Sequence, residues 1–188
     1  ANEVTILKGE SVTSITGSGE FQSLTNTSTV GGFRNGLINA DFNDDGILDF
    51  ATAESAGWTI NVEFGNGDGT FGGLTNISTA NQLLNLLSQD VNGDGYTDIV
   101  GYGGGFNVIF ANGDGTFKSA VGYGSGTTFE AEMRDMNRDG YLDMVMGSQV
   151  LGEVLISLGT GTGTFGALAT FTLPGAGNIQ GLTVNDFN

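Results

Sequence analysis

The sequence predicts an all-β fold, namely a β-propeller of four-stranded blades with an acidic loop between the first two strands of each blade. The 188 residues include 34 Gly and 1 Pro and break into short apolar runs, a pattern typical of strands joined by tight turns. Two motifs recur with a shared period of about 48 residues, and four short strands in roughly 40–50 residues are typical of one blade. A β-sandwich of irregular strands is the alternative, but it does not require this periodicity.

The composition excludes several classes of function. The chain has 5 Lys and Arg against 21 Asp and Glu, a formal charge of −16, so we expect no nucleic acid and no anionic lipid as partner. There is no Cys and no His, which removes disulfides, thiolate sites, the usual zinc ligands and the commonest general base. No apolar run approaches the ~20 residues that cross a bilayer, so we expect no membrane insertion. No signal segment is recognisable at Ala1, and we expect any targeting peptide to have been removed.

The first recurring motif is Asp-x-Asn-x-Asp-Gly-x-x-Asp. Complete copies occupy residues 41–49, 90–98 and 135–143, which we call loops I, II and III. A fourth copy starts at Asp186, and the intervals between copies are 49, 45 and 51 residues.

The second motif is a glycine-rich turn that ends in Thr-Phe. It occupies residues 67–71, 113–117 and 161–165, with a weaker copy at 17–21, and its Phe residues are 50, 46 and 48 positions apart. No Lys follows and no strand–loop–helix pattern surrounds it, so we interpret it as a hairpin turn rather than a nucleotide-binding loop.

The elements can be placed in order within the second repeat. An apolar run leads into loop II, a strand follows the loop, a third strand precedes the turn, and a fourth leaves it. The expected strands are residues 82–89, 97–102, 106–110 and 116–123. In the incomplete first unit we expect the two middle strands at residues 3–9 and 11–15.

The acidic loops have the spacing of calcium sites. Side-chain oxygens fall at positions 1, 3, 5 and 9 and a backbone carbonyl at position 7, and Ca²⁺ takes 6–8 oxygen ligands from such loops. The expected ligands in loop I are Asp41, Asn43, Asp45, Ile47 and Asp49, those in loop II are Asp90, Asn92, Asp94, Tyr96 and Asp98, and those in loop III are Asp135, Asn137, Asp139, Tyr141 and Asp143. Ile47, Tyr96 and Tyr141 would bind through their backbone carbonyls. An EF-hand is excluded, because position 12 holds no Glu and strand-like sequence flanks each loop.

Ordinary turns in an acidic surface are the alternative reading of these loops, since Asp-Gly and Asn-Gly favour turns. Against it, all 13 Asp residues fall within the repeated motifs. Carboxylates concentrated in one loop repel each other unless a cation lies among them.

Loop I followed by Phe-Gly-Asn-Gly-Asp-Gly-Thr-Phe at residues 64–71, and the matching residues 107–117, resemble the FG-GAP/VCBS repeats of integrin-α-like propellers and of FG-GAP propeller lectins. The resemblance covers nearly the whole chain. It implies that each acidic loop joins the first two strands of a blade and holds one Ca²⁺, three in this chain. Thr162 replaces the turn Asp in the third repeat, so that Asp is not expected to be a required ligand.

Three further features of the sequence bear on function. Asn26 and Asn76 lie in glycosylation sequons, and we leave their modification open. Glu130, Glu132 and Arg134 alternate as on one strand face, which we interpret as a solvated face towards the central channel, with a polar ligand site as the alternative. Trp58 is the only Trp; we expect it to pack in the core or between blades, with a sugar platform as the alternative.

The function that this reading favours is an extracellular binding or adhesion module, secreted or at the cell surface, for glycan or protein surfaces. A structural repeat of a large surface or filament protein, and an ancillary domain of a polysaccharide-degrading enzyme, are the alternatives. We expect no catalysis, because the paired carboxylates of a glycosidase would have to come from the loops.

We expect residues 1–188 to form one β-propeller domain of about four repeats. A segment of a larger ring is favoured over a four-bladed ring, because the last acidic loop is not restored by joining Asn188 to Ala1. Further blades would come from more chain or from self-association with a second copy. Pairing of residues 178–186 with 3–9 would indicate the four-bladed ring instead.

Overall fold

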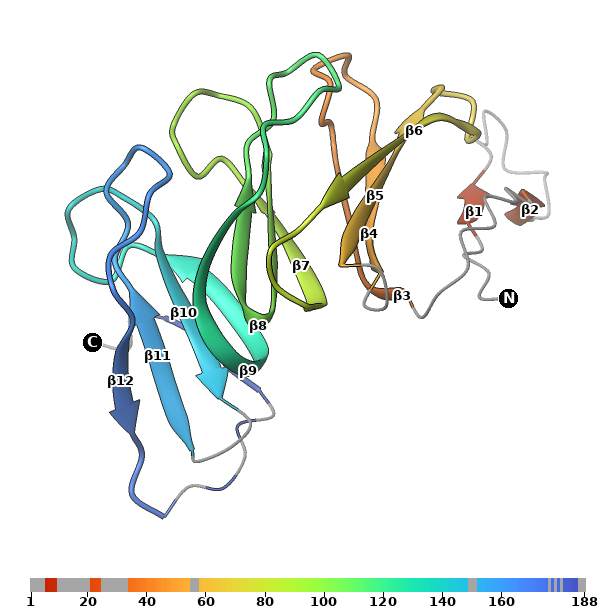
Figure 1. Ribbon diagram of the computed structural model, residues 1–188. Helices are drawn as coiled ribbons and strands as arrows, with labels where there is room; N and C mark the ends of the chain where they lie inside the picture. Colours follow the sequence, from red (N-terminus) through yellow and green to blue (C-terminus); the bar gives the residue numbers. More distant parts are fainter. Residues whose placement is uncertain are drawn as a thin grey trace.

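The computed structural model describes residues 6–9, 21–24, 34–54, 58–148, 152–175, 177, 179 and 181–185. Its regular structure within these residues is entirely β (Figure 1). The strands are β1 Ile6–Gly9, β2 Phe21–Leu24, β3 Arg34–Ala40, β4 Asp49–Glu54, β5 Thr59–Gly65, β6 Phe71–Ser78, β7 Leu83–Gln89, β8 Asp98–Ile109, β9 Val121–Arg134, β10 Asp143–Ser148, β11 Glu153–Ser157 and β12 Ala169–Thr172. In the described part of the chain, no helix has the length and apolarity needed to span a membrane.

The first complete sheet, which we call blade I, is a meander of β3, β4, β5 and β6 in chain order, each antiparallel to the next. Loop I connects β3 to β4, and the glycine-rich turn connects β5 to β6. Every residue of β4 is buried, because both faces of this central strand are covered. β6 is largely exposed, as expected of an outer edge.

β8 is a hairpin rather than one straight strand. The Asp98 carboxylate accepts a hydrogen bond from Ala111 N at 3.0 Å, whereas twelve extended residues would span roughly 36 Å. The chain reverses at three consecutive glycines, where Gly105 has φ 100 and a Cβ would lie 2.7 Å from the Tyr123 carbonyl oxygen. The first arm of β8 pairs with β7, and the second arm pairs with β9.

β9 belongs to two blades. Its residues 121–123 and Thr127 pair with β8, whereas its residues 128–134 pair with β10. The strand turns between these parts at Gly124 and Gly126, which have φ 64 and φ 135. The sheet with the order β12-β11-β10-β9-β8-β7 therefore bends at β9, and we call its two parts blade II, from β7 to the start of β9, and blade III, from the end of β9 to β12.

The hydrophobic core lies between successive blades, which stand side by side in Figure 1. One buried cluster joins blades I and II: Phe42, Ala51, Ala53, Ile60, Val62, Ile77, Leu83, Leu86, Ile99 and Ile109. The other joins blades II and III: Val91, Val100, Tyr102, Phe106, Val108, Ala131, Met133, Met144 and Met146. Burial of apolar surface therefore stabilises each blade against its neighbour.

The Phe residues that end the turns of blades II and III contribute to these interfaces. Phe117 lies edge-on to Phe42, with ring centroids 6.1 Å apart. Phe165 lies edge-on to Phe106 at 5.2 Å. The turn of one blade is thus held against the preceding blade.

Most of the strand predictions for the second repeat are confirmed, since residues 82–89 contain β7 and residues 97–102 and 106–110 match the arms of β8. The expected strand 116–123 is wrong at its start. The strand begins at Val121, and Phe117 makes only an isolated bridge to Ala111, because residues 112–116 close the turn. In the first unit, β1 pairs with β2, the segment after the turn, and residues 11–15 lie outside the described residues.

Pairing between residues 178–186 and 3–9 stays untested. Residues 181–185 carry no strand, and the rest of these two segments is only partly described.

Candidate functional site

The three acidic loops occupy equivalent places in the three blades. Each connects the inner strand of its blade to the second strand: β3 to β4, β7 to β8 and β9 to β10 (Figure 1). This is the position that the sequence analysis expected for loops I, II and III.

Position 1 of each loop organises the turn through its carboxylate. In loop I, Asp41 accepts hydrogen bonds from Asp45 N at 3.1 Å and Gly46 N at 2.7 Å. In loop III, Asp135 accepts from Asp139 N at 3.1 Å and Gly140 N at 2.8 Å. In loop II, Asp90 instead accepts from Gly93 N and Gly95 N, at 2.8 and 3.0 Å.

The side chains at positions 3 and 5 turn towards the same part of the loop. Asn43 Oδ1 accepts from Asp45 N at 3.2 Å, and Asn43 Nδ2 donates to Asp45 Oδ2 at 2.9 Å. The other Asp45 oxygen accepts from Ile47 N at 2.8 Å. The same bonds recur in loops II and III. Positions 1, 3 and 5 therefore gather their oxygens at the exposed tip of each loop.

Position 9 lies apart from this tip, in the buried root of the loop. Asp98 is fully buried, and its two carboxylate oxygens accept from Val91 N and Ala111 N, both at 3.0 Å. Asp49 and Asp143 make the same pair of bonds, each at 2.8 Å, to the loop and to the end of the third strand. The sequence analysis assigned this Asp only as a ligand and missed its structural role.

The environment of position 9 is electrostatically unfavourable for a carboxylate. Burial raises the pKa of Asp98 from 3.8 to about 6, although its two backbone hydrogen bonds oppose this shift. The charges of Asp94 and Asp90 raise it further. The pKa of Asp49 is raised for the same reasons. The tip and root carboxylates of a loop are thus close enough to repel each other.

The donor set of each loop fits a hard cation by its chemistry. All the side-chain donors are carboxylate or amide oxygens, and a carboxylate that accepts two N–H bonds retains further lone pairs for a metal. Among the described residues, however, no group of three or more Asp or Glu side chains converges to metal-binding distance. The calcium ligand set therefore remains a prediction.

The glycine-rich turns are hairpins between β-strands, as predicted. In the first, Thr70 N donates to Asp68 Oδ1 at 2.8 Å, and Asn66 N donates to the Thr70 carbonyl at 3.0 Å. In the third, Thr162 replaces the Asp and shares hydroxyl bonds with Thr160 and Thr164. The turn Asp thus closes the turn in the first two copies, and a Thr stands in its place in the third.

Each turn lies beneath the acidic loop of its own blade. A Cβ at Gly113 would overlap the Tyr96 ring, and one at Gly161 would overlap Tyr141. The turn also touches the preceding blade, because a Cβ at Gly115 would lie 3.2 Å from Phe64 and 3.6 Å from Asn43. Loop, turn and neighbouring loop thus form one continuous end of the molecule.

The predicted solvated face on β9 is only partly exposed. Arg134 is exposed, whereas Glu130 and Glu132 are half-buried. Glu132 lies 3.9 Å from Arg134 Nε and accepts a hydrogen bond from Val184 N at 3.1 Å. A cleft of about 190 Å³ separates this face from β7.

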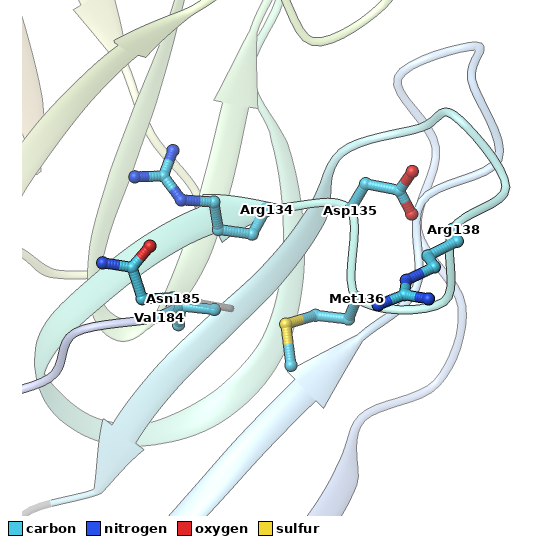
Figure 2. Close-up of a pocket in the computed structure, with 6 residues that line it drawn as sticks. All are labelled: Arg134, Asp135, Met136, Arg138, Val184 and Asn185. Atoms are coloured by element: carbon cyan, nitrogen blue, oxygen red, sulfur yellow. The ribbon is translucent and has the colours of Figure 1, made fainter. Parts of the chain in front are cut away.

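A pocket of about 350 Å³ lies where β9 enters loop III (Figure 2). It is lined by Arg134, Asp135, Met136, Arg138, Val184 and Asn185. The sequence analysis singled out only Arg134 and Asp135 of these, because Val184 and Asn185 come from the next repeat. The sequence feature that could have pointed to this pocket is Arg138, because loops I and II have Asp and Gly at the same position.

The structure also shows the positions of Trp58 and Asn76, which the sequence analysis singled out. The prediction that Trp58 packs in the core is wrong. Trp58 lies at the turn between β4 and β5 with φ 49, and its side chain is 49% exposed. The turn is held through the Trp58 backbone carbonyl, which accepts a hydrogen bond from Thr79 N at 2.8 Å, rather than through the ring. Asn76 is exposed on the outer strand β6, and Asn26 lies outside the described residues.

Comparison with known proteins agrees with this architecture. Residues 41–101, 90–146 and 135–188 match the family described as FG-GAP-like repeat. The chain is also similar to the structure of an Agrocybe aegerita lectin described as specifically recognising non-reducing terminal N-acetylglucosamine, with 26% identity over 90% of this chain and a TM-score of 0.59. The chain spans 46% of that lectin chain. No curated protein matches the sequence.

The three family matches together cover most of the chain, and their boundaries follow the loops described above. The repeating blades and the lectin neighbour indicate a non-catalytic binding fold. The chain belongs to the FG-GAP-like repeat family.

Proposed function

We propose that this chain is part of an extracellular, calcium-binding β-propeller that binds glycan surfaces and catalyses no reaction. The observation that carries the proposal is the three-fold repetition of one oxygen-rich loop at the same end of consecutive blades. Similarity to a lectin supports a saccharide ligand over a protein surface.

Calcium would be held at the tip of each loop by positions 1, 3 and 5, with the carbonyl at position 7 and with position 9 from the root. A cation there supplies positive charge that offsets the repulsion between tip and root carboxylates. The loops touch the turns of the neighbouring blades, so an ordered tip also orders the surface between blades.

A glycan array probed with the chain in calcium and in chelator tests the proposal. We expect binding to a limited set of glycans that weakens when calcium is removed, because disordered loops no longer hold the binding surface. Absence of binding to every glycan in calcium would overturn the glycan-binding function. Binding unchanged by chelator would overturn the role of the ion.

The absence of catalysis is tested separately. We expect no hydrolysis of polysaccharides by this chain. Activity that disappears in Glu130→Gln or Glu132→Gln would contradict the proposal, because those carboxylates lie outside the loops.

We also propose that residues 1–188 form part of a larger ring, completed by further chain or by a second copy. Interfaces between blades hold the core, so a terminal blade leaves apolar surface uncovered. Leu158, at the position that Phe64 and Phe110 take in blades I and II, is 45% exposed. Light scattering of the chain alone would detect self-association as a mass above 19.3 kDa.

A further inference from the structure

A pocket of about 360 Å³ lies between loop I and the glycine-rich turn of blade I. It is lined by Ile47, Leu48, Thr70 and Phe71 and by four glycines of the loop, the strand end and the turn. We call it the loop I slot. Because half of its lining residues carry no side chain, much of its wall is backbone.

In blades II and III the chain places a tyrosine ring between loop and turn. Position 7 of the acidic loop is Tyr96 in loop II and Tyr141 in loop III. The Tyr96 ring lies against Gly113 of its turn so closely that a Cβ on this glycine would overlap it, and the Tyr141 ring lies against Gly161 in the same way. A phenol ring is therefore the group that fits between these two segments.

Blade I has the same backbone arrangement without the ring. Position 7 of loop I is Ile47, and Gly67 is the turn glycine that corresponds to those beneath the tyrosines. Ile47 reaches this glycine only with its Cδ1 atom, 3.2 Å from where a Cβ would stand. Both residues line the loop I slot, so the slot lies where the other two blades have an aromatic ring.

The walls of the slot are apolar and held in place. Leu48 is 60% exposed, and the Phe71 ring packs edge-on against Phe50, with ring centroids 4.8 Å apart. Gly65 N donates to Asp49 Oδ1 at 2.8 Å, which fixes the strand end against the root of loop I. An apolar group of another molecule that enters such a preformed pocket gains free energy by burial, with little cost in ordering the walls.

The rim of the slot is negatively charged. Asp45 precedes one lining glycine and Asp68 lies between two others, and both residues are exposed. Loop I also has Asp44 at position 4, where loops II and III have Gly93 and Arg138. Asp44 and Asp68 lie outside the proposed calcium ligand set, so their charges persist when the ion is bound. Positive groups beside an entering ring are therefore attracted.

We propose that the loop I slot binds a tyrosine side chain of a partner protein, within a segment whose neighbouring residues are Lys or Arg. The ring has the shape with which the chain fills this space twice, and the basic neighbours complement the rim. This protein-docking site belongs to blade I alone and does not depend on the proposed glycan binding.

The test uses three peptides that differ in one feature each: N-acetyl-Lys-Tyr-Lys-amide, the peptide with Ala in place of Tyr, and the peptide with Glu in place of both Lys. Each is titrated against the full chain in calcium, and binding is followed by calorimetry and by the NMR signals of the Ile and Leu methyl groups. We expect the first peptide to bind more than tenfold tighter than the Ala peptide, because the ring is buried. We expect it to bind about tenfold tighter than the Glu peptide at low salt.

The matched variant is Ile47→Tyr, which gives loop I the residue of loops II and III. The new ring should fill the slot, so we expect the loss of peptide binding and a melting temperature equal to or above that of the wild type. Ile47→Val is the control, because it leaves the slot open and should retain binding. The reverse variant, Tyr96→Ile, should open an equivalent slot in blade II and add a second binding site for the peptide.

Each outcome bears on one part of the proposal. Binding that persists in Ile47→Tyr, or that Ile47→Val also abolishes, would overturn the site. Equal binding of the Tyr and Ala peptides would overturn the aromatic occupant, and equal binding of the Lys and Glu peptides would overturn the basic neighbours. Displacement of the peptide by methyl glucoside would show a saccharide site instead of a protein-docking site. Failure of the glycan array would overturn the proposed function and leave the loop I slot untouched.

Discussion

The tip and the root of each acidic loop use the same residue type in different ways. At the tip, Asp94 is exposed and its carboxylate bonds to neighbouring loop residues. At the root, Asp98 is fully buried and joins the loop to the end of the third strand. One motif thus combines a part that builds the blade with a part that is available to an ion.

The largest expected effect comes from the root. Asp98→Ala removes the partner of two buried N–H groups, those of Val91 and Ala111, and each unsatisfied donor costs about 1–3 kcal/mol. We expect the free energy of unfolding to fall by about 3 kcal/mol in chelator, and by more in calcium, because the variant also loses a proposed ligand of the ion. Denaturant unfolding measures it, and a variant that unfolds like the wild type in chelator would show that the root is not structural.

The next effect comes from the tip and depends on calcium. Saturation of one site at 100-fold over its Kd adds about 2.7 kcal/mol to stability. Asp94→Asn keeps an acceptor for Tyr96 N but removes the charge, so we expect it to lose the contribution of one loop out of three. Melting curves with and without calcium measure this loss. If chelator leaves the wild-type melting temperature unchanged, the loops are ordinary turns.

A smaller expected effect is the difference in stability between replacing a packed glycine and replacing an exposed glycine by alanine. Gly113 and Gly93 have nearly the same φ, 74 and 75, but a Cβ would overlap the Tyr96 ring at Gly113 and meet nothing within 4 Å at Gly93. Gly93→Ala should cost roughly 1 kcal/mol for its backbone alone. Gly113→Ala should cost more, and equal melting temperatures for the two variants would contradict the packing of turn under loop.

The smallest effect is a pH dependence in chelator. Because the pKa of Asp98 is raised from 3.8 to about 6 in the folded state, the folded chain binds this proton more tightly than the unfolded chain does. Asp98 therefore destabilises the fold above pH 6, and the penalty is relieved as the pH falls from about 6 towards 3.8. We expect the melting temperature to rise slightly between pH 7 and pH 5, and Asp98→Asn to rise less. A fall over this interval would contradict the assigned pKa.

Much of the fold follows from the sequence because the repeat is local. The spacing of loop and turn motifs places β7, both arms of β8 and the hairpin turns, since each depends on residues within one period. Trp58 shows the limit: a lone Trp is usually buried, but the strand pairing around it puts the ring at an exposed turn.

The candidate site can be predicted from the sequence less fully than the fold. The spacing of Asp94 and Asp98 does not reveal that one faces solvent and the other the interior, because that depends on where the third strand ends. The pocket beside loop III depends on contacts between β9 and the next repeat, and no local pattern records them. The calcium ligand set itself stays a prediction.

The shared strand β9 has a consequence for how such proteins change size. Since one strand leaves blade II and enters blade III, the repeat in the gene and the blade in space are out of phase. Duplicating a stretch of one period would therefore insert one whole blade, wherever the breakpoints fall.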